Sequence, residues 1–479
     1  MQKVKPAMQF FLRGPVTALL TALPLASLGA APAPPIAIVG ATVIHPELVG
    51  AATSAPDTTV IISGKHITAV GPTASTAVPR GARVIDGHGK WVIPGLIDSH
   101  VHFFQSGNLY TRPDVVDLNA FVPYAQEVKR NTARLPLTFR VWLASGVTGV
   151  ADVGGPLWNF KMRAAARASD TAPRVAATGP LISMVDRPQL DLGDPPIIKI
   201  TSPQAARELV RRELAYKPDF IKVWYIHRPG DELAAQEGIV RATAEAAHAA
   251  GLRLAVHATE LETAKSALRA GADFLVHSVQ DAPVDEEFLA LARARHILYC
   301  PTLFVYMGYG YALSGTWQPT EAEQRLADPE ILKGLHVPEN AGSAQVPERM
   351  AKLISEHREP ELPTIAMQNL MTVWNAGITV VMGTDAGNIG TVHGPSVFRE
   401  MQLMQRAGLT PQQVLKSATV NGAATLGLHE LGAVGAGKLA DLVLLDADPL
   451  TDTANLSHAR AVFKDGREFE PKELMSALH

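Results

Sequence analysis

The chain has 479 residues but only one cysteine, Cys300, so it cannot form an intramolecular disulfide. It also lacks an excess of charge, because 43 Lys and Arg face 46 Asp and Glu and leave a formal net charge of −3. Basic residues are not clustered with aromatic ones, so we expect no nucleic-acid partner. His-Glu-x-x-His and Gly-x-Ser-x-Gly motifs are absent as well, which excludes two common kinds of catalytic site.

Only one apolar run approaches the length of a membrane span. It covers residues 15–28, follows three basic residues, and is followed by small residues and a Pro/Ala linker. This order is typical of a secretory signal, and the run is short for a bilayer. We therefore predict a signal peptide and linker at 1–33, an exported protein in the periplasm or outside the cell, and no membrane contact of the mature form.

Short strands are expected at both ends of the chain. These segments are rich in Val, Ile and Thr and are punctuated by Gly, which is typical of hairpins. They cover 36–44, 58–71, 82–95, 437–450 and 459–469. We predict that 34–93 plus 431–479 form one small β-sandwich domain.

The middle of the chain alternates between strand and helix patterns. The expected strands are 95–103, 147–155, 174–183, 220–225, 253–258, 274–279, 298–306 and 378–386, and the helices between them have apolar residues at helical spacing. Eight such strands predict an α/β fold, a (β/α)8 TIM barrel over 94–430 with an insertion at about 308–360. A doubly wound sheet is the alternative.

Metal-ligand or base residues stand at or near the ends of five of these strands. His100 and His102 are two residues apart, so in a strand they face the same side at about 6.6 Å. The other four are Lys222, His257, His277 and Asp385. Closing the barrel would bring these strand ends around one centre, where barrel active sites are built. The pattern predicts a metal site.

Six segments, in order, carry a family resemblance. They are PGLIDSHVH, FIKVW, LAVHA, FLVHS, MGTDAG and GKLADLVLLDADP. The chain resembles the amidohydrolase superfamily, and within it the metal-dependent dipeptidases of the Xaa-Pro and Xaa-Arg type with their carboxypeptidase-like and ochratoxin-hydrolysing relatives. Those dipeptidases usually continue after the strand-four lysine with a Gly-rich turn. Here Lys222 is followed by Val-Trp-Tyr-Ile-His, so the substrate cannot be transferred from the resemblance.

The resemblance implies a hydrolase that attacks an amide bond with a metal-activated hydroxide. The substrate would be small: a dipeptide, an N-acyl amino acid or an amide-linked toxin such as ochratoxin. Two divalent ions are expected, zinc first, with manganese or cobalt as alternatives. His100, His102 and Asp385 would hold one ion and His257 and His277 the other, with a CO2-derived carbamate on Lys222 between them.

Asp385 would also transfer the proton during catalysis. Tyr225, Tyr306 and His393 are candidate substrate contacts, whereas Arg228 is expected at the surface. Relatives of this kind often assemble, so a homo-oligomer is predicted.

One rival function is a cyclic-amide hydrolase or deaminase acting on an imidazolone or hydantoin ring. Lys222 argues against the deaminase, because deaminases of the superfamily commonly lack this lysine. The other rival is a noncatalytic metal-binding protein.

Overall fold

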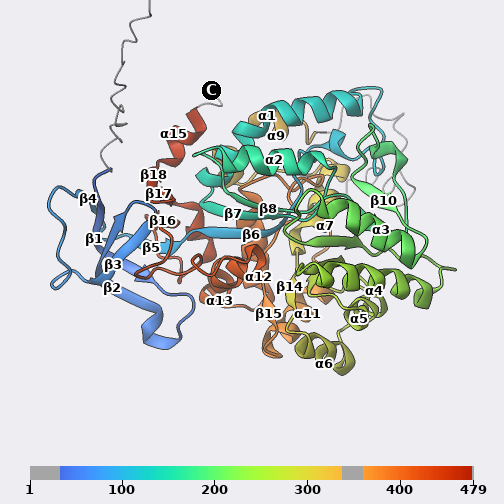
Figure 1. Cartoon of the computed structure of the whole chain (residues 1–479). Coiled ribbons are helices and arrows are strands. Elements are labelled where there is room, and N and C mark those ends of the chain that lie inside the picture. The colour runs from blue at the N-terminus through green and yellow to red at the C-terminus, as the bar shows by residue number, and fades with distance from the viewer. Residues whose placement is uncertain (1–32, 337–359, 477–479) are drawn as a thin grey trace, which may run out of the picture. The chain divides into compact units, whose positions relative to one another are not determined.

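The computed structural model describes residues 33–336 and 360–476, and its helices and strands alternate through most of them (Figure 1). The predicted signal peptide and linker lie outside the described residues apart from position 33, as do residues 337–359 of the predicted insertion. Within the described ranges, no helix combines the length and the apolar character that a bilayer crossing requires.

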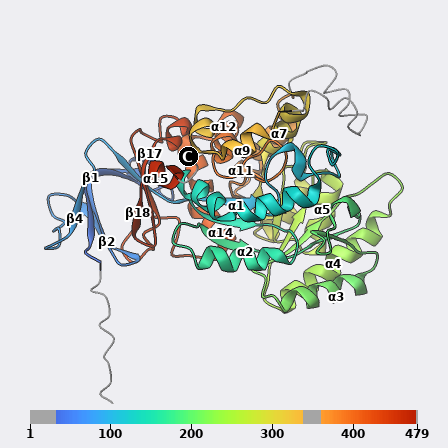
Figure 2. The ribbon, with the colours of Figure 1, turned by 90° about the horizontal axis from the view of Figure 1, so that it is seen from above.

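Strands from both ends of the chain form one mixed sheet, which we call the terminal sheet. Its members are β1 (Ile36–Ile44), β2 (Ser54–Ser63), β3 (His66–Pro72), β4 (Arg83–Asp86), β5 (Trp91–Pro94), β16 (Leu442–Leu445), β17 (Ala459–Lys464) and β18 (Arg467–Phe469). Figures 1 and 2 show the blue N-terminal strands next to the red C-terminal ones, and β5 pairs antiparallel with β16. The two ends therefore meet as predicted. A second sheet facing this one is not found among the described strands, so the sandwich is not confirmed.

The terminal sheet has its own apolar core, to which both chain ends contribute. Ile38 and Val60 from the first strands pack in one cluster with Leu442 and Phe463 from the last ones. Phe463 is completely buried. Burial of these side chains joins segments that lie hundreds of residues apart in the sequence.

Replacing Phe463 with Ala should therefore lower the free energy of unfolding by about 3–5 kcal/mol, since it removes a buried aromatic ring and leaves a cavity. Urea denaturation measures the loss. Phe121→Ala is the matched control, because the ring of Phe121 is exposed and its removal should cost only about 0.5 kcal/mol. Equal losses in the two variants would contradict this packing.

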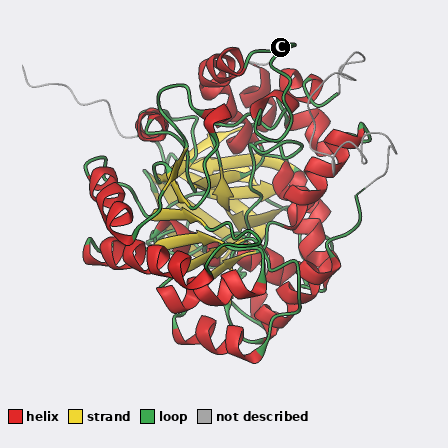
Figure 3. Cartoon of the chain, turned by 90° about the vertical axis from the view of Figure 1, so that its right-hand side faces the viewer, coloured by secondary structure: helices red, strands yellow, loops and turns green. Residues whose placement is uncertain are grey.

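Parallel strands form the centre of the larger part of the chain, and Figure 3 shows the yellow strands with red helices around them. One sheet contains β6 (Leu96–Val101), β7 (Val147–Asp152) and β8 (Arg174–Ala177); the other contains β10 (Ile197–Lys199), β9 (Leu181–Ser183), β11 (Ile221–Trp224), β12 (Leu254–His257), β13 (Phe274–Val276), β14 (Leu298–Cys300) and β15 (Thr379–Val380) in that order. Their connecting helices include α1 (Tyr124–Ala144), α2 (Trp158–Arg167), α3 (Pro203–Leu214), α4 (Leu233–Ala249), α5 (Leu261–Ala270), α6 (Glu286–Ala294), α11 (Thr364–Asn375) and α12 (Ser396–Ala407). The alternation of strand and helix is as predicted.

The strand pairing does not close into one continuous barrel. The predicted third strand, 174–183, is interrupted at Pro180, which has no backbone N–H to donate to a neighbour. As a result β8 pairs with β7, whereas β9 pairs with β10 and β11. On the opposite side, single backbone hydrogen bonds connect β6 with the residues after β15, among them Asp385 N to His100 O at 2.7 Å.

The strand predicted at 298–306 is wrong in its second half. Strand β14 ends at Cys300, and helix α7 (Leu303–Ser314) begins three residues later, so Tyr306 lies in a helix. Thr302, at a φ of 44°, turns the chain, and Glu400 accepts hydrogen bonds from the first two helical N–H groups at 2.8 Å. The described part of the predicted insertion continues with α8 (Glu321–Leu326) and α9 (Pro329–Lys333).

Candidate active site

Two histidines at the end of β6 point at the same carboxylate. Nε2 of His100 and Nε2 of His102 each lie 3.2 Å from Oδ1 of Asp385. Nδ1 of His102 lies 2.6 Å from the carbonyl oxygen of Gly154, which can only accept a hydrogen bond, so Nδ1 carries the proton. Nε2 of the neutral ring is then a free lone pair that points into the site, which is the state a metal ligand needs.

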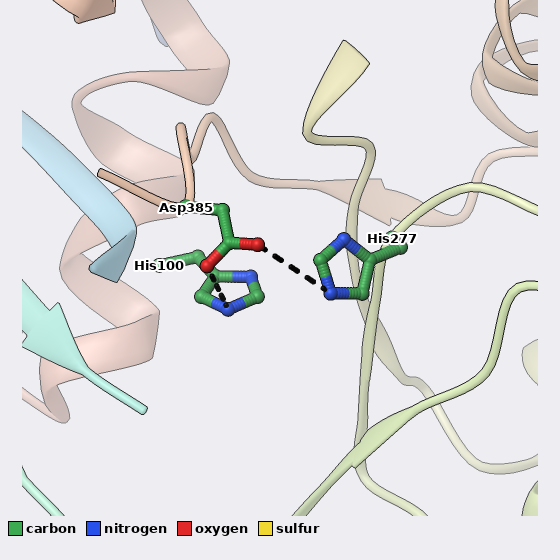
Figure 4. A group of neighbouring side chains, drawn as sticks. All are labelled: His100, His277 and Asp385. Carbon is green, nitrogen blue, oxygen red and sulfur yellow. Dashed lines mark ion pairs between the residues drawn. The ribbon is translucent and has the colours of Figure 1, made fainter. Parts of the chain in front are cut away.

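Asp385 is also close to a third histidine, His277, which follows β13. The distance from Oδ2 of Asp385 to Nε2 of His277 is 3.9 Å. Figure 4 shows how the carboxylate lies between the rings of His100 and His277, and one ligand atom from each of these three residues lies within 4.8 Å of the others. Such an arrangement is the right size to surround one cation.

The backbone around this cluster adopts conformations that are unfavourable for residues other than glycine. Asp385 has a φ of 62° and His277 a φ of 76°. Left-handed backbone at non-glycine residues costs of the order of 1–3 kcal/mol, and it persists where the surrounding structure holds it for function. Both strained residues carry side chains of the cluster.

Lys222 and His257 complete the group from the neighbouring strands. Lys222 is 1% exposed, and among the described residues no carboxylate forms an ion pair with its amine. Burial lowers the pKa of Lys222 to about 7, so the unprotonated amine is far more populated near neutral pH than in an ordinary lysine. His257 pairs in register with Trp224 on β11, and its ring centre lies 4.5 Å from that of His277.

Burial favours the neutral form of three histidines of the cluster. Burial lowers the pKa of His100, His257 and His277 well below the usual value, and the positive charge of Lys222 lowers each of them further. A neutral imidazole has a lone pair to give to a metal, whereas an imidazolium has none.

Two further residues hold the cluster in place, and the sequence had not singled them out. Asp98 is completely buried and accepts hydrogen bonds from the backbone N–H of His100 and of Thr384, both at 3.0 Å, and from the Thr384 hydroxyl at 2.6 Å. It therefore fixes β6 to the segment that carries Asp385. Oγ1 of Thr302 lies 2.6 Å from Nδ1 of His277 and orients that ring.

All six predicted ligand residues line one cavity of about 610 Å³, but the predicted substrate contacts do not all do so. Tyr306 lines it and is 62% exposed. Tyr225 lies in the core instead, where its hydroxyl is 3.0 Å from that of Ser266. His393 is stacked on Phe103, and its Nε2 donates to the carbonyl of Gln105 at 2.9 Å. Tyr225 and His393 therefore have no part in the cavity wall.

The cavity contains charged residues that sequence reasoning missed. They include Arg112, Asp114 and Arg187; Glu361 also lines the cavity, and Trp224 lies beside Arg187 in the wall. Arg112, Asp114 and Arg187 come from irregular segments between strands, where no periodic pattern could have identified them.

The model of the Amidohydrolase family matches residues 91–476, most of the chain. The chain belongs to the amidohydrolase family. The family resemblance found in the sequence is therefore confirmed.

Curated relatives align with this amidohydrolase over short segments. One is imidazolonepropionase from Cutibacterium acnes, 42% identical over 76 residues, which are 16% of this chain and 19% of the relative. Another is ochratoxinase from Aspergillus niger, 30% identical over 100 residues, which are 20% of each protein. The alignments thus cover about a fifth of these relatives, and the segments are too short to transfer an activity.

Solved structures match over nearly the whole chain. A Xaa-Pro dipeptidase with bound methionine in the active site has a TM-score of 0.66 at 22% identity, covering 91% of this chain and 100% of that one. Ochratoxinase from A. niger has a TM-score of 0.67 at 20% identity, covering 91% and 96%. At this identity the likeness concerns the fold, which is of the TIM-barrel type.

Proposed function

We propose that this amidohydrolase cleaves the amide bond of a small substrate, a dipeptide or an N-acyl amino acid, with an amide-linked toxin such as ochratoxin as a further member of the class. The observation that carries the proposal is the convergence of four histidines, a lysine and an aspartate on one cavity. Two of the similar solved structures, those of a Xaa-Pro dipeptidase and an ochratoxinase, support this substrate class.

The residues of the cluster fit divalent metal ions. Oδ1 of Asp385 and Nδ1 of His100 are buried and have no hydrogen-bond partner among the described residues, and the Nε2 atoms of His100 and His102 face the same oxygen at 3.2 Å. Acceptor atoms facing one another repel, and a cation between them removes that repulsion. Imidazole nitrogens and carboxylate oxygens are ligands for zinc, and also for manganese and cobalt.

In the proposed site His100, His102 and Asp385 hold one ion, and His257 and His277 hold the second. Lys222 lines the same cavity, and its unprotonated amine would add to CO2 and release a proton, giving a carbamate that would provide oxygen ligands for the ions. The carbamate also adds a negative charge where Asp385 would otherwise be the only anion against about four positive charges.

During hydrolysis the bound ions would acidify the attacking water and polarise the substrate carbonyl. Asp385 takes the proton of the water on Oδ2, because Oδ1 is the oxygen directed at His100 and His102. It then delivers the proton to the leaving nitrogen. Asp98 keeps the Asp385 segment against β6 through both steps, and Thr302 keeps His277 oriented.

A second candidate is the opening of a cyclic amide. The segment that is 42% identical to imidazolonepropionase favours it, although that segment covers only 16% of the chain. The two candidates use the same side chains and differ in product, because a linear amide gives two molecules whereas a ring gives one.

The test combines metal content with product analysis. Protein prepared in bicarbonate without chelators should contain two divalent ions per chain and should release a free amino acid from a panel of dipeptides and N-acyl amino acids. Removing the ions with a chelator should abolish turnover and lower the melting temperature, and adding zinc should restore both. Ring-opened product or ammonia as the only product would support the rival chemistries, and a metal-loaded protein inert towards every amide would indicate a noncatalytic metal-binding protein.

Export and self-association also belong to this proposal. The order of basic, apolar and small residues in the first 33 positions supports cleavage of a signal peptide and an exported mature enzyme. A homo-oligomer is proposed from the family resemblance. Mass spectrometry of the mature N-terminus and light scattering test the two statements.

A further inference from the structure

Three charged side chains form a second polar cluster in the cavity wall, away from the proposed metal ligands. Arg112 makes two parallel hydrogen bonds to Asp114, each of 2.7 Å. Its remaining terminal nitrogen donates to Asn388 at 2.8 Å and to the Tyr309 hydroxyl at 3.1 Å. Nε of Arg187 lies 3.2 Å from the same Asp114. One carboxylate therefore serves two guanidinium groups, and the cluster has a surplus positive charge.

The surplus charge resides on Arg187. Arg112 is 13% exposed and its guanidinium donates hydrogen bonds to Asp114, Tyr309 and Asn388, so few of its N–H groups remain for a ligand. Arg187 is 23% exposed, lines the cavity, and uses Nε for Asp114 and one terminal nitrogen for the carbonyl of Asp186. Its other terminal nitrogen forms no hydrogen bond or ion pair with the described residues.

Arg187 stands at a suitable distance from the proposed metal site. Its guanidinium carbon lies 4.9 Å from the centre of the Trp224 ring, and that ring centre lies 6.1 Å from the centre of the His257 ring. These two contacts place the guanidinium no more than about 11 Å from His257, and an extended peptide advances about 3.3–3.6 Å per residue. The bound of about 11 Å corresponds to at most about three extended residues, so a substrate with the length of a dipeptide, together with its contacts at both ends, fits between His257 and Arg187.

Trp224 sets the orientation of the guanidinium. It is two residues after Lys222 on β11, so both side chains lie on the same face of that strand. The aromatic face under Arg187 holds the planar group at the wall and leaves its edge open to the cavity.

We propose that Arg187 binds a free carboxylate of the substrate, and that the preferred substrates are therefore amides of amino acids with an unmodified carboxyl group. This inference rests on the proposed amide hydrolysis and names the part of the substrate that the cavity recognises. The guanidinium edge and a carboxylate match in geometry and charge. Asp114 is a positioning residue, since it holds Arg187 through Nε.

Arg228 provides a matched comparison. Burial is the main cause that lowers the pKa of Arg187, the charge of Arg112 lowers it further, and the nearby charge of Arg228 adds to this effect. The side chain of Arg228 is nevertheless exposed and does not line the cavity. Neutralising Arg228 changes the local potential without removing a contact to the substrate.

The experiment compares N-acyl amino acids with their methylamides, which lack the negative charge, in the wild-type holoenzyme and in Arg187→Met, Arg187→Lys and Arg228→Met. The wild type should prefer the acids by about 10- to 100-fold in kcat/KM, mainly through KM, as expected for a hydrogen bond between charged groups. Arg187→Met should lose this preference, because its kcat/KM for the acids should fall to about that for the methylamides. Arg187→Lys should retain part of it, and Arg228→Met nearly all.

Equal rates of the wild type on acids and methylamides would overturn the carboxylate site and leave amide hydrolysis intact, as would an unchanged preference in Arg187→Met. No turnover of either series would contradict the proposed function instead. In that case calorimetric binding of the same acids decides the inference: binding to the wild type should be at least tenfold tighter than to Arg187→Met, and equal or absent binding would overturn it. Melting curves of all variants show that they are folded.

Discussion

Asp385→Asn is expected to lower kcat about a thousandfold or more while at least one metal ion remains bound. The amide of Asn cannot take a proton from water, and general acid–base catalysis typically contributes a factor of about 10² to 10⁴. The carbonyl oxygen of Asn can still face His100 and His102, where Asp385 now lies at 3.2 Å, so part of the coordination survives. Elemental analysis and steady-state kinetics measure the two effects separately.

Asp170→Asn is the matched control, because its side chain is 73% exposed and lies outside the cavity. This variant should retain full activity. An Asp385→Asn enzyme with near wild-type kcat would refute the proton-transfer role, whatever its metal content.

Lys222→Ala is expected to abolish turnover and to reduce the bound metal to less than one ion per chain. The substitution removes the amine that would carry the carbamate, and the site then lacks the anion between its two groups of histidines. Acetate or propionate should restore part of the activity, since a small carboxylic acid can occupy the space of the missing side chain and supply two oxygens. Metal analysis and rates with increasing acid measure the recovery.

Lys222→Arg should be inactive and resistant to this rescue, because arginine fills the space and keeps a positive charge. Lys161→Ala, at an exposed position on α2, should behave as the wild type. If acids fail to stimulate Lys222→Ala although it binds two ions, the carbamate has no place in the site.

The positions of the six proposed ligands were predictable because each lies within or directly after an apolar strand pattern, and parallel strands end at one side of a barrel. The expectation that Tyr225 contacts the substrate was wrong, and the geometry of a strand explains why. Strand residues alternate between faces, so a residue three after Lys222 points away from the face that carries it, and the hydroxyl of Tyr225 indeed meets Ser266 in the core.

Other features depend on contacts between distant parts of the chain, which sequence patterns do not contain. The apolar run at 298–306 suits a strand as well as a helix, and the helix is selected by Glu400, which binds the N-terminus of α7 from about a hundred positions further on. Arg112 and Arg187 share Asp114 although they lie on separate loops. Loop residues have no periodicity from which such side-chain contacts can be inferred.

The pairing of β5 with β16 sets the order in which the enzyme can be completed during synthesis. β5 leads through Gly95 directly into β6, the strand of His100. The strand that pairs with β5 on one side is β16, and it is synthesised only after all the proposed metal ligands. Until β16 has been made, this edge of β5 is unpaired and can associate with other chains. Chaperones protect surfaces of this kind. A nascent chain can therefore contain all six proposed metal ligands before β16, the antiparallel neighbour of β5, has been made.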